Sequence, residues 1–291
     1  MELSRRSFVM SASAAALAAA LPVSAAPARP YKLAVGYGMI GIKGTVLEKF
    51  QLLKDVGFDG VEINAPGAVN RDEALAARDK TGIAVHGVVD SVHWGTRLSD
   101  PDPAVREKGL KGLLAALEDA KFLGADTVLL VPGAVKNKET ENFEQAWQRS
   151  QEQSRLAIPT AVKLGVKIAI EVVWNEFLLT PPQLIQYVDE FKNPVIGAYF
   201  DTGNMVKYGV PPATWIRMLG RLMIKLHLKS YSASAVKNKW VAIGDGDEDY
   251  PEVAKALKEV GYAGWATAEV GGGDGKVLQD VRQRMEKALG M

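Results

Sequence analysis

Short apolar runs alternate with longer amphipathic stretches from Tyr31 to the end of the chain. The runs have the length and the Val, Ile and Leu content of strands that are shielded on both faces. The stretches between them carry apolar residues at helical spacing, as at Val46, Phe50 and Leu53. Because neighbouring parallel strands need a long connection, this alternation favours a parallel sheet whose strands are linked by helices.

The pattern predicts eight strands, at residues 31–36, 61–63, 82–89, 127–131, 166–170, 195–200, 223–228 and 265–270. Helices are predicted at 46–56, 70–79, 102–123, 142–164, 182–191, 250–260 and 276–289, with a short helix at 212–219. Eight βα units in roughly 260 residues have the size of one barrel. We therefore predict a single (β/α)₈ TIM barrel over residues 27–291.

A doubly wound open sheet is the main alternative fold. Such a sheet normally has a glycine-rich phosphate loop after its first strand. The run Gly36-Tyr37-Gly38-Met39-Ile40-Gly41 resembles that loop only loosely, and no acidic ribose-binding residue clearly follows it. The barrel therefore explains the sequence better.

The first 26 residues differ from the rest and resemble an export signal. Ser4-Arg5-Arg6-Ser7-Phe8 is similar to a twin-arginine signal, and the Ala- and Leu-rich stretch 10–21 is too short to span a membrane. Val23-Ser24-Ala25 offers small residues for cleavage. We predict a twin-arginine signal peptide over residues 1–26, a periplasmic protein and no stable membrane insertion after cleavage. A disordered or amphipathic tail with a chance Arg pair is the alternative.

Composition excludes several functional classes. The chain has no cysteine, so disulfides, thiolate metal ligands and a cysteine nucleophile are excluded, and the three histidines are His86, His93 and His227. Its 35 basic and 34 acidic residues show no basic excess. This balance argues against nucleic acid as a partner, and against a DNA-repair endonuclease, which needs several metals and many histidines. A homo-oligomer is left open.

Four polar residues lie at the ends of the last four predicted strands: Glu171, Asp201, His227 and Glu269. An apolar strand shielded on both faces has little reason to carry an unpaired charge. In a barrel, the carboxyl ends of the strands converge at one mouth. Any one of the four alone could be a helix cap or a turn residue, but together they predict a metal site. Three carboxylates and one imidazole suit Mn²⁺, Mg²⁺ or Co²⁺, with Zn²⁺ as an alternative.

These residues, with the segments 199–204 and 244–264, carry a family resemblance. The chain resembles the xylose-isomerase-like sugar isomerase/epimerase superfamily, which includes hydroxypyruvate isomerase and the ketose 3-epimerases. The resemblance implies a TIM barrel and one divalent metal held by the same four residues. Ketose 3-epimerases usually have a histidine where this chain has Asn204 and a glutamate where it has Phe177. An arginine expected after the seventh strand is not evident, although Lys229 and Lys237 lie near that position.

The predicted activity is that of an isomerase, either a sugar epimerase or an aldose–ketose isomerase. Glu171 and Glu269 are the predicted catalytic residues, one removing a proton beside a carbonyl and the other returning it to an enediolate. Export favours a small, non-phosphorylated sugar as substrate, because phosphorylated sugars are kept in the cytoplasm. The alternatives are a lyase or hydro-lyase acting on 3-keto-glycosides and a non-catalytic sugar-binding barrel.

The remaining candidates are predicted to bind substrate and are named in sequence order: His93, Trp94, Asn175, Asn204 and Lys229. The asparagines and the lysine can hydrogen-bond sugar oxygens, and the indole can stack on a sugar face. For each of them a turn or packing role is the alternative. Trp174 has the same two interpretations, and His86 is more typical of a structural histidine. Glu62, which ends strand two, is a candidate for supporting the metal ligands and is not among the four predicted ligands.

Overall fold

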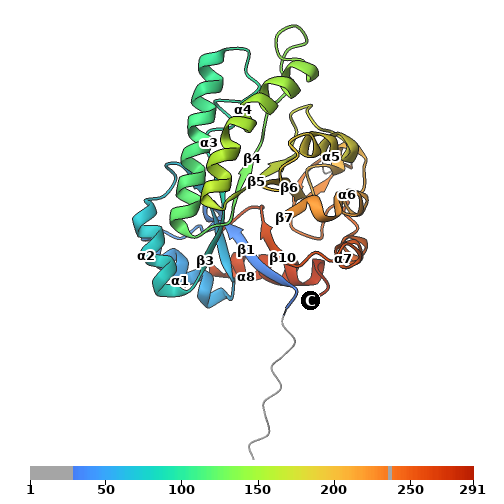
Figure 1. The fold of residues 1–291 in the computed structure, drawn as a ribbon. Coiled ribbons are helices and arrows are strands. Elements are labelled where there is room, and N and C mark those ends of the chain that lie inside the picture. The colour runs from blue at the N-terminus through green and yellow to red at the C-terminus, as the bar shows by residue number, and fades with distance from the viewer. Residues whose placement is uncertain (1–28, 235–237) are drawn as a thin grey trace, which may run out of the picture.

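The computed structural model describes residues 29–234 and 238–291, and within them the chain forms the predicted barrel (Figure 1). Eight parallel strands close in the order β1-β10-β7-β6-β5-β4-β3-β2. Closure occurs at β1, where Val35 pairs with Val61 on one side and with Ala268 on the other. The predicted signal peptide at 1–26 lies outside the described residues.

The barrel strands follow the predicted order along the chain. They are β1 (Tyr31–Gly36), β2 (Gly60–Ala65), β3 (Ala84–Asp90), β4 (Thr127–Leu130), β5 (Lys167–Glu171), β6 (Ile196–Asp201), β7 (Met223–Leu228) and β10 (Gly264–Ala268). The third strand begins two residues later than predicted. Gly82 has a φ of 80° and its N–H donates to the carbonyl of Arg78, so this glycine ends the preceding helix.

Helices lie outside the strands around the barrel (Figure 1). The α-helices are α1 (Val46–Val56), α2 (Arg71–Thr81), α3 (Pro103–Leu123), α4 (Phe143–Leu164), α5 (Pro181–Asp189), α6 (Pro212–Leu219), α7 (Tyr250–Glu259) and α8 (Gly275–Ala288). The 3₁₀ helices of the described residues are η1 (Tyr37–Met39), η2 (Val206–Tyr208) and η3 (Gly220–Leu222). Among the helices of the described ranges, none combines the length and apolar character that a membrane crossing requires.

The apolar core lies between the strands and the helices. Phe50 and Leu53 of α1 are fully buried, in agreement with the predicted helical spacing, and Leu113 and Leu117 of α3 are fully buried as well. The α1 helix begins at a capping box in which the Thr45 side chain accepts from the Glu48 N–H, while the Glu48 carboxylate accepts from the Thr45 N–H. The helical layer thus fixes the strands that carry the polar residues.

An antiparallel hairpin follows β7 and was not predicted. It consists of β8 (Ser230–Ser232) and β9 (Lys239–Val241), with Tyr231 opposite Trp240. Strands of three residues carry too little alternation to be recognised in sequence. The hairpin begins two residues after the end of β7, so it lies at the carboxyl end of the barrel.

Candidate metal centre

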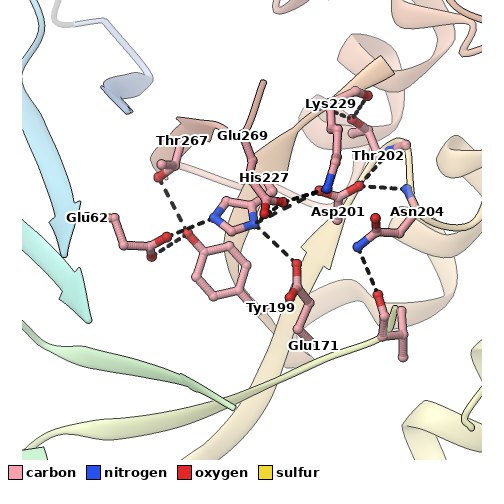
Figure 2. A network of polar contacts seen from close by, with 12 residues as sticks. Glu62, Glu171, Tyr199, Asp201, Thr202, Asn204, His227, Lys229, Thr267 and Glu269 are labelled. Carbon is pink, nitrogen blue, oxygen red and sulfur yellow. Dashed lines mark hydrogen bonds and ion pairs between the residues drawn. The ribbon is translucent and has the colours of Figure 1, made fainter. Parts of the chain in front are cut away.

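The structure brings together the four residues that end the last four barrel strands (Figure 2). Glu171 and Asp201 are the last residues of β5 and β6, His227 lies near the end of β7, and Glu269 follows β10. Asp201 and His227 are directly opposite each other in the strand pairing. Each residue contributes one ligand atom, and these atoms lie within 4.8 Å of one another. This is the spacing of a group that can hold one metal ion.

The imidazole of His227 presents Nδ1 to the three carboxylates. Nδ1 lies 3.2 Å from Glu171 Oε1, 3.6 Å from Glu269 Oε2 and 4.0 Å from Asp201 Oδ2. The carboxylates come from three different strands, so they surround this nitrogen from separate directions. A cation among them would have oxygen and nitrogen donors on several sides.

One oxygen of Asp201 lacks a hydrogen-bond donor. Oδ1 accepts the N–H groups of Gly203 and Asn204 at 2.7 Å each. Oδ2 is buried, and no donor among the described residues reaches it. Because a buried carboxylate oxygen without a partner costs free energy, this atom needs a positive partner. A metal ion at the centre of the cluster fits that requirement.

The electrostatics of the cluster lead to the same conclusion. Burial raises the pKa of Glu171 to about 7 and that of Asp201 to about 6. Burial opposes ionisation of Glu269 as well, but His227 and Lys229 outweigh it and lower the pKa of Glu269. Ionised carboxylates crowded in a buried site repel one another, and a bound cation relieves that repulsion.

Glu62 of β2 also reaches His227, so it lies where a residue that supports a metal ligand is expected. Its Oε2 lies 2.9 Å from Nε2 of His227, and its Oε1 accepts the hydroxyl of Tyr199 at 2.9 Å (Figure 2). Glu62 is buried, with 3% of its surface exposed. A carboxylate that binds one imidazole nitrogen leaves the other for a metal. In the sequence, the only sign of this role is that Glu62 is an acidic residue between the apolar residues Val61 and Ile63 of a strand.

His86 lies deeper in the barrel and does not join the cluster. Its Nε2 lies 2.9 Å from the hydroxyl of Thr267, and its backbone carbonyl accepts from Lys225 Nζ at 3.0 Å. Burial and the charge of Lys225 hold the pKa of His86 well below its usual range. His86 is therefore a neutral, hydrogen-bonded core residue, in line with the structural alternative.

Two of the five predicted substrate-binding residues lie beside the cluster. Lys229 Nζ is 3.0 Å from Glu269 Oε2. The Asn204 N–H donates to Asp201, and its side-chain amide donates to the carbonyl of Val172 at 3.2 Å. Lys237 lies outside the described residues. Lys229 thus places a cation beside the partly exposed carboxylate of Glu269.

The other three predicted substrate-binding residues contact neighbouring loops. Asn175 donates to the carbonyl of Gly133 at 2.6 Å and accepts from the Phe177 N–H, so its amide joins two loops. His93 accepts the N–H of Val131 at 3.3 Å through Nδ1. Trp94 packs with its ring edge-on to that of His93 and is 60% exposed. None of the hydrogen bonds or ion pairs of these three within the described ranges reaches the cluster.

Comparisons with known proteins identify the family of this barrel. The family model for the Xylose isomerase-like TIM barrel matches residues 50–288. L-ribulose-5-phosphate 3-epimerase UlaE of Escherichia coli strain K12 is 26% identical over 261 residues, which cover 83% of this chain and 90% of the relative.

Solved structures share the fold. The 3-keto-D-glucoside 4-epimerase YcjR from E. coli superposes with a TM-score of 0.75 at 18% identity, covering 90% of this chain and 100% of that one. An L-ribulose 3-epimerase gives a TM-score of 0.69 at 17% identity, covering 90% of this chain and 86% of that one. At these identities the likeness shows the barrel fold alone.

Proposed function

The chain belongs to the Xylose isomerase-like TIM barrel family, and from this premise we propose that it is a divalent-metal-dependent sugar epimerase or isomerase. The observation that carries the proposal is the convergence of Glu171, Asp201, His227 and Glu269 on one point at the carboxyl end of the barrel. The curated relatives, which are named as sugar epimerases, support the reaction class.

The proposed metal is Mn²⁺, Mg²⁺ or Co²⁺, held by Glu171, Asp201, Glu269 and Nδ1 of His227. The unpartnered Oδ2 of Asp201 and the three carboxylates suit a hard to borderline cation. When bound, such a cation withdraws electrons from a substrate carbonyl and stabilises the negative charge that develops beside it.

Proton transfer is assigned to Glu171 and Glu269. The two come from β5 and from the end of β10, so they approach a substrate from different sides. Glu171 is almost fully buried, whereas the side chain of Glu269 is 49% exposed and has Lys229 Nζ at 3.0 Å. One carboxylate would remove the proton beside the carbonyl, and the other would return a proton to the resulting enediolate. Return to the same carbon gives epimerisation, and return to the adjacent carbon gives isomerisation.

An elimination on a 3-keto-glycoside is the second candidate function, because it begins with the same proton removal. Two residues, Phe177 and Asn204, favour elimination as an alternative to epimerisation. Phe177 is 1% exposed and packs against the rings of Trp147 and Tyr187, so no glutamate approaches the site from that position. The Asn204 amide is bound to the carbonyl of Val172. Where ketose 3-epimerases usually have polar substrate contacts, this chain has a buried ring and a bound amide.

The test is proton exchange with solvent. The Mn²⁺-loaded protein is incubated in D₂O with a panel of free ketoses and 3-keto-glycosides, and deuterium uptake beside the carbonyl is followed by NMR. We expect uptake with at least one substrate and a loss of about 10²- to 10⁴-fold in Glu269→Gln. The exposed Glu144→Gln is the matched control and should behave as wild type. Absence of uptake with every substrate would contradict the proposal and leave a sugar-binding barrel.

We further propose export to the periplasm by the twin-arginine route. The support is the order of features in residues 1–26, namely Arg5-Arg6, an apolar stretch and small residues before position 26. Cell fractionation of the full chain should place the wild type in the periplasm and retain an Arg5→Lys, Arg6→Lys double variant in the cytoplasm. The same distribution of the wild type and the double variant between periplasm and cytoplasm would contradict export by the twin-arginine route.

A further inference from the structure

A cavity of about 590 Å³ adjoins the candidate metal centre. Its wall includes Lys229 and Glu269 of that centre, the segment 240–243, the residues after β10 and one side of α8. It therefore lies between the segments that follow the seventh and eighth barrel strands. TIM barrels frequently bind phosphate groups in this region, so the charge of the cavity decides what it can accept.

The two described cations that line the cavity, Lys229 and Arg284, are already paired. Lys229 Nζ lies 3.0 Å from Glu269 Oε2. Arg284 lies 2.8 Å from Asp280 and 3.1 Å from Asp245 through two different nitrogens. Among the residues that the structure describes, the charged ones that line the cavity are Lys229, Arg284, Glu269 and Asp280, and their formal charges cancel. A phosphate monoester would have to displace one of these carboxylates to gain a cation.

The amino end of α8 is also occupied. The side chain of Asp274 accepts the N–H groups of Lys276 and Val277 at 3.0 and 3.1 Å. These first-turn amides are the groups that a helix would otherwise offer to a phosphate. An anion approaching this end would instead meet the carboxylate of Asp274.

The rest of the wall is apolar and includes an aromatic ring. Trp240, Ile243 and Val277 line the cavity, and Trp240 is 41% exposed. Trp240 is held in place because it stacks on Trp174 with centroids 4.7 Å apart, and Tyr231 packs against both rings. A fixed aromatic side chain beside hydrogen-bonding groups suits the mixed C–H and hydroxyl surface of a sugar ring.

From these observations we infer that the cavity is a subsite for an uncharged glycosyl group, so that the substrate is a keto-sugar bearing a second sugar ring. The inference rests on the proposed function, because it assumes that the keto-sugar itself lies at the metal centre. The inference narrows the substrate class to glycosylated keto-sugars. A phosphorylated ketose of the same length would gain no binding free energy from the apolar and charge-paired lining of the cavity.

Three ketoses that differ only at one oxygen test the subsite. Fructose, fructose 6-phosphate and isomaltulose, which carries a glucosyl group at the position of the phosphate, are titrated into the Mn²⁺-loaded full chain by calorimetry. We expect isomaltulose to bind at least about tenfold more tightly than fructose, and fructose 6-phosphate to bind no more tightly than fructose. Tighter binding of the phosphate ester, or no saturable binding of isomaltulose, would overturn the inference.

A matched pair of variants locates the effect. Val277→Trp places a large ring in the cavity from an exposed position of α8, and Leu156→Trp makes a similar change on the exposed surface of α4. We expect Val277→Trp to abolish the preference for isomaltulose over fructose, and Leu156→Trp to retain it. An unchanged preference in Val277→Trp would overturn the subsite.

The two proposals fail in distinguishable ways. Binding measures the subsite, whereas deuterium uptake measures proton transfer. Uptake with a free ketose together with equal binding of fructose and isomaltulose would refute the subsite and leave the proposed function intact. Tight isomaltulose binding without uptake would refute the catalytic proposal and retain the sugar site.

Discussion

The carboxylate of Glu62 lies 2.9 Å from Nε2 of His227, while the other ring nitrogen faces Glu171 at 3.2 Å. Strands β2 and β7 are not neighbours, because β1 and β10 lie between them in the barrel. The Glu62 side chain therefore reaches across the barrel interior. It fixes the ring so that Nδ1 points into the cluster of carboxylates, which makes Glu62 a positioning residue for the metal centre.

Replacing Glu62 by Gln should weaken metal binding without removing a ligand. The amide is a weaker acceptor for the His227 N–H, so the ring loses part of its orientation. We expect about 10- to 100-fold lower Mn²⁺ affinity, measured by calorimetry on the apo protein. Glu144→Gln, on the exposed face of α4, is the control. Wild-type affinity in Glu62→Gln would show that this contact does not position the ring.

Asp201→Asn should leave the stability of the metal-free protein unchanged or higher, and should weaken metal binding. Without metal, the buried Oδ2 of Asp201 has no donor among the described residues, so the neutral amide should be tolerated at least as well as the carboxylate. Metal at a hundredfold excess over Kd stabilises the wild type by about 2.7 kcal/mol. Thermal unfolding should show this gain in the wild type and a much smaller gain in Asp201→Asn. Equal gains in both proteins would exclude Asp201 as a ligand.

Asp90, the last residue of β3, should make the protein less stable at alkaline pH. Burial raises its pKa from 3.8 to about 7. The folded chain holds this proton more tightly than the unfolded chain, so the free energy of unfolding falls as pH rises between these values. Asp90→Asn still accepts the Val92 N–H. We expect it to be more stable than wild type at pH ~8, by up to about 4 kcal/mol, and the difference to shrink at pH ~5. Denaturant unfolding of both proteins at the two pH values measures this difference in the free energy of unfolding. The same difference at both pH values would contradict the prediction.

The pair Lys225–Asp126 should respond unequally to loss of either partner. Lys225 is buried and its Nζ lies 2.8 Å from Asp126 Oδ1, whose side chain is 68% exposed. Asp126→Ala leaves a buried ammonium with less compensation, and we expect a loss of about 1–2 kcal/mol. Lys225→Met leaves a solvated carboxylate, but it also removes the donor to the buried carbonyl of His86, so we expect a larger loss, of about 2–3 kcal/mol. Denaturant unfolding compares the two, and a larger loss in Asp126→Ala would contradict this assignment.

Much of the fold was predictable because its signals are local. The alternation of apolar runs and helical spacing marks each βα unit, and Gly57, Gly124 and Gly165 end three of the helices with positive φ. The four residues at the strand ends could be selected because every strand of such a barrel points its carboxyl end to the same mouth. The hairpin after β7 was missed because its two strands have only three residues each.

The side-chain contacts that could not be predicted from the sequence join strands that lie far apart along the chain. Glu62 and His227 are 165 positions apart, and no local pattern indicates that they meet. The amide of Asn175 joins two loops, a role that the sequence offered only as the alternative to binding a substrate hydroxyl. Which polar side chain faces the site and which supports a loop is decided by tertiary packing.

The central claim is that one divalent cation binds among Glu171, Asp201, His227 and Glu269. Crystals of the full chain grown with Mn²⁺ and measured at the manganese absorption edge test it directly. We expect a single anomalous peak in contact with the three carboxylates and with Nδ1 of His227. A peak elsewhere, contact through other residues, or no peak at saturating Mn²⁺ would contradict the claim.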